Sequence, residues 1–131
     1  MSDNPYVERG EIYLAPTFQG VGVGRVLLDH QVTLHIGSDA LVIEVPFDVT
    51  DGTTSVHIVP GNSDRLSGAS TLLNAVCRSV QLHKSGVLLV EFADDRVLTV
   101  RPSEEFESWQ AFVRGRNMVV CSPGGALSFF G

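Results

Sequence analysis

Short runs of alternating apolar and polar residues, each closed by turn-forming residues, constrain this chain more than any other feature. Residues 32–36 and 41–45 are two such runs, and the intervening residues 37–40 (GSDA) are typical of a hairpin turn. Strands this short and this closely spaced favour a mostly β fold, in which antiparallel strands form a sandwich or an open barrel. The other segments with the same pattern are residues 21–28, 55–59, 76–83, 87–92, 97–101, 117–122 and 126–130.

One segment departs from this pattern and predicts a single short helix. It lies between residues 63 and 75, where Ser63 or Asp64 would cap the first turn. Gly68 weakens this prediction, because glycine disfavours the interior of a helix. The apolar residues at roughly helical spacing are Leu66, Leu72, Leu73 and Val76.

A weak internal repeat relates the two halves of the chain. Residues 32–39 align with residues 88–95 at a constant offset of 56. The repeat predicts a single domain, 1–131, built from two related β-meanders that pack face to face and cover each other's apolar sides. Its halves lie at about residues 18–62 and 72–131. Chance similarity between amphipathic hairpins is the alternative explanation.

Size and hydrophobicity bound the class of protein. The chain has 131 residues, of which 44% are hydrophobic, enough for one domain with a sizeable core. No apolar run approaches the ~20 residues that span a bilayer. Residues 1–5 include no basic region that leads into an apolar stretch, so no signal peptide is expected. A cytoplasmic protein without a membrane partner is therefore predicted.

The net charge of −6 is concentrated in the first half. Residues 1–65 contain nine acids and three arginines, whereas residues 66–131 contain six acids and six basic residues. Nucleic acid is not expected as a partner, because phosphate binding requires clustered Lys and Arg. A protein with a basic surface fits this charge, although the charge can also serve solubility alone.

Two cysteines, Cys77 and Cys121, each end an apolar run. Their spacing matches neither a redox motif nor a zinc motif. We interpret both as reduced thiols in the core, because free cysteine often behaves as a small buried hydrophobe.

Three histidines on predicted strands raise the question of a metal or acid–base site. His35 and His57 lie between apolar neighbours, and His83 ends a strand, so alternation places all three on the outer faces. Three imidazoles on adjacent strands would suit zinc, yet no two of them have ligand-type spacing. Exposed histidines on a polar face are the favoured interpretation, and no metal, cofactor or catalytic residue is assigned.

Two further motifs have ordinary structural explanations. The glycines of residues 20–24 lack the strand–helix context of a nucleotide-binding loop and fit a bulged strand better. Residues 48–52 (DVTDG) are acidic but lack the alternating ligands of a calcium loop, so a turn is expected there.

The only tryptophan, Trp109, lies in a polar segment beside several glutamates. We expect it to act as a lid on the core, with its indole N–H bonded to backbone; the alternative is an exposed anchor for a partner. The three-residue spacing of Phe106, Trp109 and Phe112 predicts shared burial and a short helical turn, with Glu107 and Ser108 facing water.

The second half resembles a family of small, mainly actinomycete (hence bacterial) domains of unknown function. Members have an L-x-F-x-D-G hairpin, an L-x-V-x-P strand, a Y/F-E-x-W step and a C-terminal P-G-G-x-L turn. The matching stretches here are residues 90–95, 98–102, 106–109 and 123–127. Asp95 stands where the hairpin glycine is usual. The resemblance implies a fold and no activity, and genes of this kind often look like accessory or immunity-type proteins.

Three functions remain open. The first is a non-enzymatic protein-binding or accessory module, such as an immunity-like inhibitor of a basic partner. The second is a structural homo-oligomer subunit, and the third is a small hydrolase or metal-dependent enzyme that uses the strand histidines. The residues assigned to partner binding are Asp48, Asp51, Glu107 and Trp109.

Overall fold

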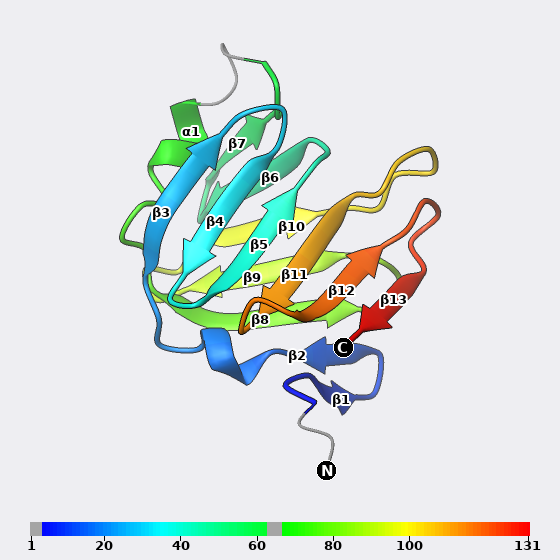
Figure 1. Cartoon of the computed structure of the whole chain (residues 1–131). Coiled ribbons are helices and arrows are strands. Elements are labelled where there is room, and N and C mark those ends of the chain that lie inside the picture. The colour runs from blue at the N-terminus through cyan, green and yellow to red at the C-terminus, as the bar shows by residue number, and fades with distance from the viewer. Residues whose placement is uncertain (1–3, 63–66) are drawn as a thin grey trace.

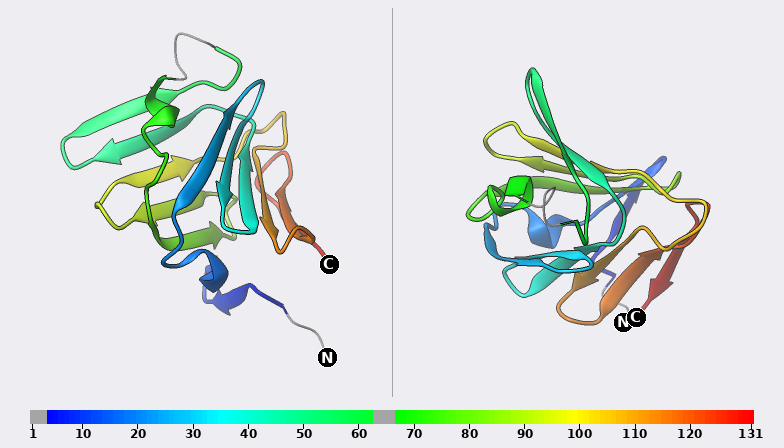
Figure 2. Two further views of the ribbon diagram at one scale, coloured as in Figure 1. Left: turned by 60° about the vertical axis from the view of Figure 1, so that its left-hand side comes forward. Right: turned by 90° about the horizontal axis from the view of Figure 1, so that it is seen from above.

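Two antiparallel β-sheets face each other in the computed structural model, which describes residues 4–62 and 67–131 (Figures 1 and 2). The seven-stranded sheet has the order β1 (Val7–Arg9), β2 (Ile12–Leu14), β8 (Cys77–His83), β9 (Leu88–Phe92), β10 (Val97–Val100), β6 (Phe47–Asp51) and β7 (Thr54–Ile58). The six-stranded sheet has the order β13 (Leu127–Phe130), β12 (Asn117–Cys121), β11 (Trp109–Val113), β5 (Asp39–Ile43), β4 (Val32–Ile36) and β3 (Val23–Leu28).

The core fills the space between the sheets. Along β9, Leu88, Val90 and Phe92 are buried while the residues between them are partly exposed, as alternation in a half-buried strand requires. Between strands of different sheets the described residues show one isolated bridge, Gly22 to Val76, at one corner. The mostly β prediction is therefore confirmed: the described strands form two antiparallel sheets that pack face to face and do not close into a barrel.

The order of strands repeats between the two halves. The meander β3–β4–β5 lies in the six-stranded sheet and β8–β9–β10 lies in the seven-stranded sheet. The hairpin that follows each meander belongs to the opposite sheet. The first strand of hairpin β6–β7 pairs with β10, and the first strand of hairpin β11–β12 pairs with β5. Pro46 and Pro102, which share the offset of 56, stand after β5 and β10 at the two crossings. The topology thus agrees with two related meanders that pack face to face.

In the described residues, helical structure is confined to two short elements, the 3-10 helix η1 (Pro16–Phe18) and α1 (Ser67–Ser70). Within the described part of the predicted helix over residues 63–75, the helix ends at Ser70, and Leu73 beyond it is exposed. Its proposed caps, Ser63 and Asp64, lie outside the described residues. In residues 4–62 and 67–131, no helix is long and apolar enough to cross a membrane.

Two predicted turns are strands in the structure. Residues 48–51, expected to be a turn, belong to β6, because Phe47 and Val49 alternate into the core and the turn follows at Gly52. The helical turn expected around Trp109 is wrong too, because residues 109–113 form β11 between β5 and β12. Pairing on both sides with two strands overrides a local three-residue spacing.

Candidate protein-binding face

Trp109 occupies the core at the start of β11. Its side chain is 0% exposed and its Nε1 donates a hydrogen bond of 2.8 Å to the carbonyl oxygen of Gly86. Gly86 and Gly125 approach each other so closely that a Cβ on Gly86 would lie 2.6 Å from the Cα of Gly125. The prediction that Trp109 is a buried lid with a backbone partner is confirmed. Because the ring is enclosed, Trp109 leaves the set of residues assigned to partner contact.

The neighbours of Trp109 differ from expectation. Phe106 is 63% exposed and Phe112 is half-buried on the outer side of β11, so the predicted shared burial is wrong. Ser108 is fully buried rather than facing water, because its hydroxyl accepts a hydrogen bond of 2.8 Å from the backbone N–H of Ser103. Glu107 is exposed, as expected.

Both cysteines are buried and free, as predicted. Burial raises the pKa of the Cys77 thiol to about 11 and raises the pKa of Cys121 in the same way. The Cys121 thiol also donates to the carbonyl oxygen of Gly86, at 3.4 Å. Neither thiol is therefore poised as a nucleophile, since the thiolate is the reactive form.

The strand histidines do not converge. His35 lies on β4 of the six-stranded sheet, while His57 on the edge strand β7 and His83 on β8 are separated by three strands of the other sheet. Among the described residues, no group of three His, Cys, Asp or Glu side chains is placed to hold a metal ion. The arrangement gives no support to a zinc site on these histidines.

Asp48 and Asp51 lie on β6 of the seven-stranded sheet, away from Glu107. The Asp48 carboxylate accepts from His57 Nδ1 at 2.8 Å and from Arg101 at 3.4 Å, so it already has two cationic or polar partners. Asp51 lines a shallow hollow of about 340 Å³ together with Arg96. That guanidinium is held by Asp94 and by the carbonyl oxygen of Thr71.

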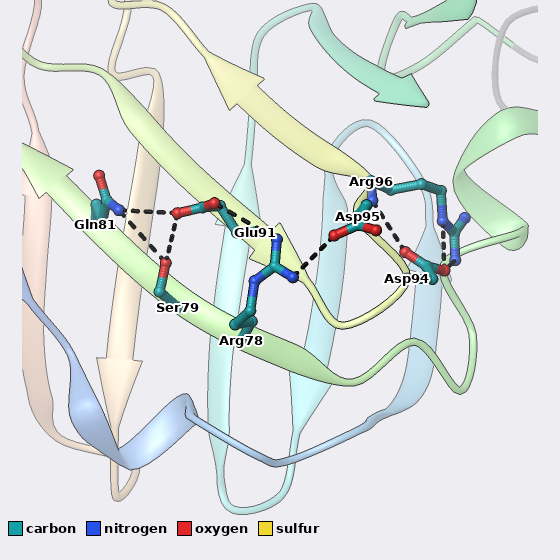
Figure 3. A network of polar contacts seen from close by, with 7 residues as sticks. All are labelled: Arg78, Ser79, Gln81, Glu91, Asp94, Asp95 and Arg96. Carbon is teal, nitrogen blue, oxygen red and sulfur yellow. Dashed lines mark hydrogen bonds and ion pairs between the residues drawn. The ribbon is translucent and has the colours of Figure 1, made fainter. Parts of the chain in front are cut away.

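The outer face of the seven-stranded sheet carries a polar network (Figure 3). Arg78 donates to Asp95 at 2.9 Å and lies 3.7 Å from Glu91, which also accepts from Ser79 and Gln81 at 3.1 Å. In the adjacent loop, the hydrogen bond from Arg96 lowers the pKa of Asp94 below its ordinary value. All six ion pairs between described residues involve this sheet or its loops.

The outer face of the six-stranded sheet, which lies toward the viewer in Figure 1, combines seven apolar side chains with five polar or charged ones. Strand pairing places Val42 of β5 beside Gln110 of β11, and Phe112 beside Met118 of β12. We call this surface the apolar face. Its side chains, from β3 to β13, are Arg25, Leu27, Thr33, His35, Ala40, Val42, Gln110, Phe112, Met118, Val120, Ser128 and Phe130.

Charged residues flank the apolar face at its two ends. Asp29, Glu44 and Glu107 lie where β3 and β5 end and β11 begins; we call this the acidic end. Arg25, Arg114 and Arg116 lie at the opposite end, near the β11–β12 loop; we call this the basic end. In the described part of the chain, none of these six residues takes part in an ion pair.

A hollow of about 370 Å³ runs along β11, β12 and β13, from Met118 and Phe130 to Glu107 at the acidic end. The Gln110 amide donates to the carboxylates of Glu44 and Glu107, and so holds two acids side by side. Glu107, assigned to partner binding from the sequence, lies at this hollow, whereas the apolar lining was not predicted, in part because β11 was expected to be helical. Strand alternation across β11 and β12 is the signal that finds it. The hollow is lined by Glu107, Gln110, Met118, Val120, Ser122, Ser128 and Phe130.

The fold and this surface define a class: a two-sheet β-sandwich domain with partly exposed apolar side chains on the outer face of one sheet. The chain belongs to a family of unknown function, DUF6188, whose model matches residues 14–131. This match confirms the resemblance to a family without known activity and extends it over the first half of the chain. No curated protein and no solved structure matches it.

Proposed function

We propose that this chain is a protein-binding module that acts by association rather than by catalysis, and that the apolar face is its binding surface. The supporting observation is the contrast between the outer faces of the two sheets. One face pairs its charges with one another, whereas the other presents Phe112, Met118 and Phe130 to solvent, the last 53% exposed. Partly exposed apolar side chains next to polar and charged ones are typical of a protein-interaction site.

The charges at the acidic end specify the chemistry of the partner. Glu44 and Glu107 are exposed and have no cationic partner among the described residues. A protein surface that carries Lys or Arg beside apolar side chains would pair with them and cover the hollow. Of the residues assigned from the sequence, Glu107 belongs to this proposal, while Asp48 and Asp51 lie on the other sheet. The proposal includes an accessory or immunity-like role in the cytoplasm, in which the module covers a basic patch of another protein.

A photo-crosslinking residue at position 112 tests the proposal. p-Benzoylphenylalanine in place of Phe112 should form an adduct with a specific protein in the native host, whereas the same residue in place of Leu89, on the outer face of β9, should not. The captured protein, once purified, should bind the wild type and lose at least about tenfold in affinity for Phe112→Asp. Equal crosslinking from both positions, or equal binding to both proteins, contradicts the proposal.

A further inference from the structure

The geometry points to a second copy of this chain as a partner of the apolar face, in a two-fold dimer; this inference rests on the proposed function of that face. A partner of the required chemistry carries basic side chains beside apolar ones. The basic end of the apolar face itself meets that description, because Arg114 and Arg116 adjoin Phe112 and Met118 along β11 and β12.

A two-fold axis in the interface plane, perpendicular to the strands, makes the face self-complementary. This rotation reverses the strand direction while each strand stays opposite its own copy, so the acidic end of one protomer covers the basic end of the other. Asp29, directly after β3, then lies over the start of β3 in the second copy, about two positions along the strand from Arg25. Glu107, at the start of β11, lies over the β11–β12 loop with Arg116. Each contact occurs twice, as in any isologous interface.

The size of the face is compatible with a weak dimer. Six strands at ~4.8 Å spacing and about five residues per strand at ~3.3 Å cover a footprint of roughly 29 by 17 Å, or ~500 Å². Side-chain relief and the flanking loops add to this, whereas a standard interface buries about 800 Å² on each partner. The other in-plane axis, parallel to the strands, would place acid against acid, which disfavours it.

Charge reversal at each end tests the dimer. The variant Glu44→Lys/Glu107→Lys has two basic ends, and Arg114→Glu/Arg116→Glu has two acidic ends. By sedimentation velocity between about 1 µM and 1 mM, we expect the wild type to dimerise with a micromolar Kd. Each variant alone should dimerise at least about tenfold more weakly. An equimolar mixture of the two should form a heterodimer about as tight as the wild-type dimer.

The mixture separates a charge effect from damage to the fold, since a misfolded variant would not recover on mixing. The control Glu11→Lys/Asp51→Lys makes the same change of net charge on the seven-stranded sheet and should leave the wild-type Kd unchanged. A wild type that is monomeric at 1 mM, or a mixture no tighter than its components, overturns the dimer. Without a dimer, the proposed function still stands if the photo-crosslinking residue at position 112 captures a different protein. If it captures neither a second copy nor another protein, the dimer and the proposed function are both contradicted.

Discussion

The two sheets have similar inner faces and opposite outer faces. On the seven-stranded sheet, Arg78 of β8 pairs with Glu91 of β9 and with Asp95 in the loop after β9, so these charges are satisfied within the molecule. On the six-stranded sheet, Glu107 and Arg116 lie at opposite ends of an apolar surface without ion pairs among the described residues. The difference teaches that an antiparallel sheet does not dictate the chemistry of its outer face, because alternate positions along each strand vary independently.

The largest expected effect tests the claim that the inner faces are equivalent. Trp109→Ala and Phe92→Ala should each lower the free energy of unfolding by about 3–5 kcal/mol, because each removes a large, fully buried ring, one from each sheet. Urea denaturation at neutral pH measures both. Trp109→Phe, which keeps an aromatic ring but loses the hydrogen bond to Gly86, should lose less. If either alanine variant leaves the free energy of unfolding unchanged, the inner faces of the two sheets do not contribute equally to the stability of the core.

The second effect concerns a thiol on the inner face of β8. Burial raises the pKa of Cys77 to about 11, so between roughly pH 9 and 11 the unfolded chain releases a proton that the folded chain keeps. The free energy of unfolding should therefore fall as pH rises through this window, by about 2–3 kcal/mol from this group. Cys77→Ala should have a shallower alkaline slope in urea titrations at stepped pH. If Cys77→Ala and the wild type lose stability equally with rising pH, groups other than Cys77 cause the alkaline loss of stability.

The third effect compares the outer faces directly. Phe112→Asp and Leu89→Asp place the same charge on the two outer faces, on strands that are both paired on two sides. Each should cost about 1 kcal/mol of stability. Only Phe112→Asp should reduce the binding of 8-anilinonaphthalene-1-sulfonate, a dye that reports exposed apolar surface. If both variants bind the dye equally, the apolar face is not distinct in solution.

The smallest effect tests the polar network. Glu91→Gln should lower stability by up to ~1 kcal/mol, because it weakens the ion pair with Arg78 on a partly exposed surface. Glu107→Gln, the matched change on the acidic end, should leave stability unchanged. Thermal melts in 0.05 M and 1 M NaCl check both, and salt should shrink the difference. An equal loss for both variants would mean that the network of Figure 3 contributes nothing.

Much of the fold was predictable because its strands carry a local pattern. Residues 32–36 were predicted as a strand and are one, and the predicted run at residues 87–92 includes the whole of β9. Asp95 illustrates a finer agreement. It has a φ of 71°, which explains why the family resemblance places glycine at this position of the hairpin loop.

The features that the sequence analysis predicted wrongly or missed share a physical cause: each depends on strands that are distant in the sequence. Nothing local shows that β11 pairs with both β5 and β12, and without that pairing Trp109 fits a helical turn as well as a strand. The apolar face was missed for the same reason, since it is assembled from six strands, β3, β4, β5, β11, β12 and β13. Glu107 was predicted to be exposed and is exposed, but its assignment to partner binding stays a prediction. The single-domain assignment stays a prediction.

The exchange of hairpins between the sheets has a consequence for how the chain reaches its native state. Ile43 pairs with Trp109, 66 residues later. The backbone groups along one edge of β5 therefore stay unpaired until β11, in the C-terminal half, has folded against them. Folds dominated by such distant pairings reach the native state in milliseconds to seconds rather than microseconds. During that time an identical hairpin from another molecule can occupy the same edge. Misassembly by swapping of β11–β12 is thus a hazard of folding at high concentration rather than of the finished protein.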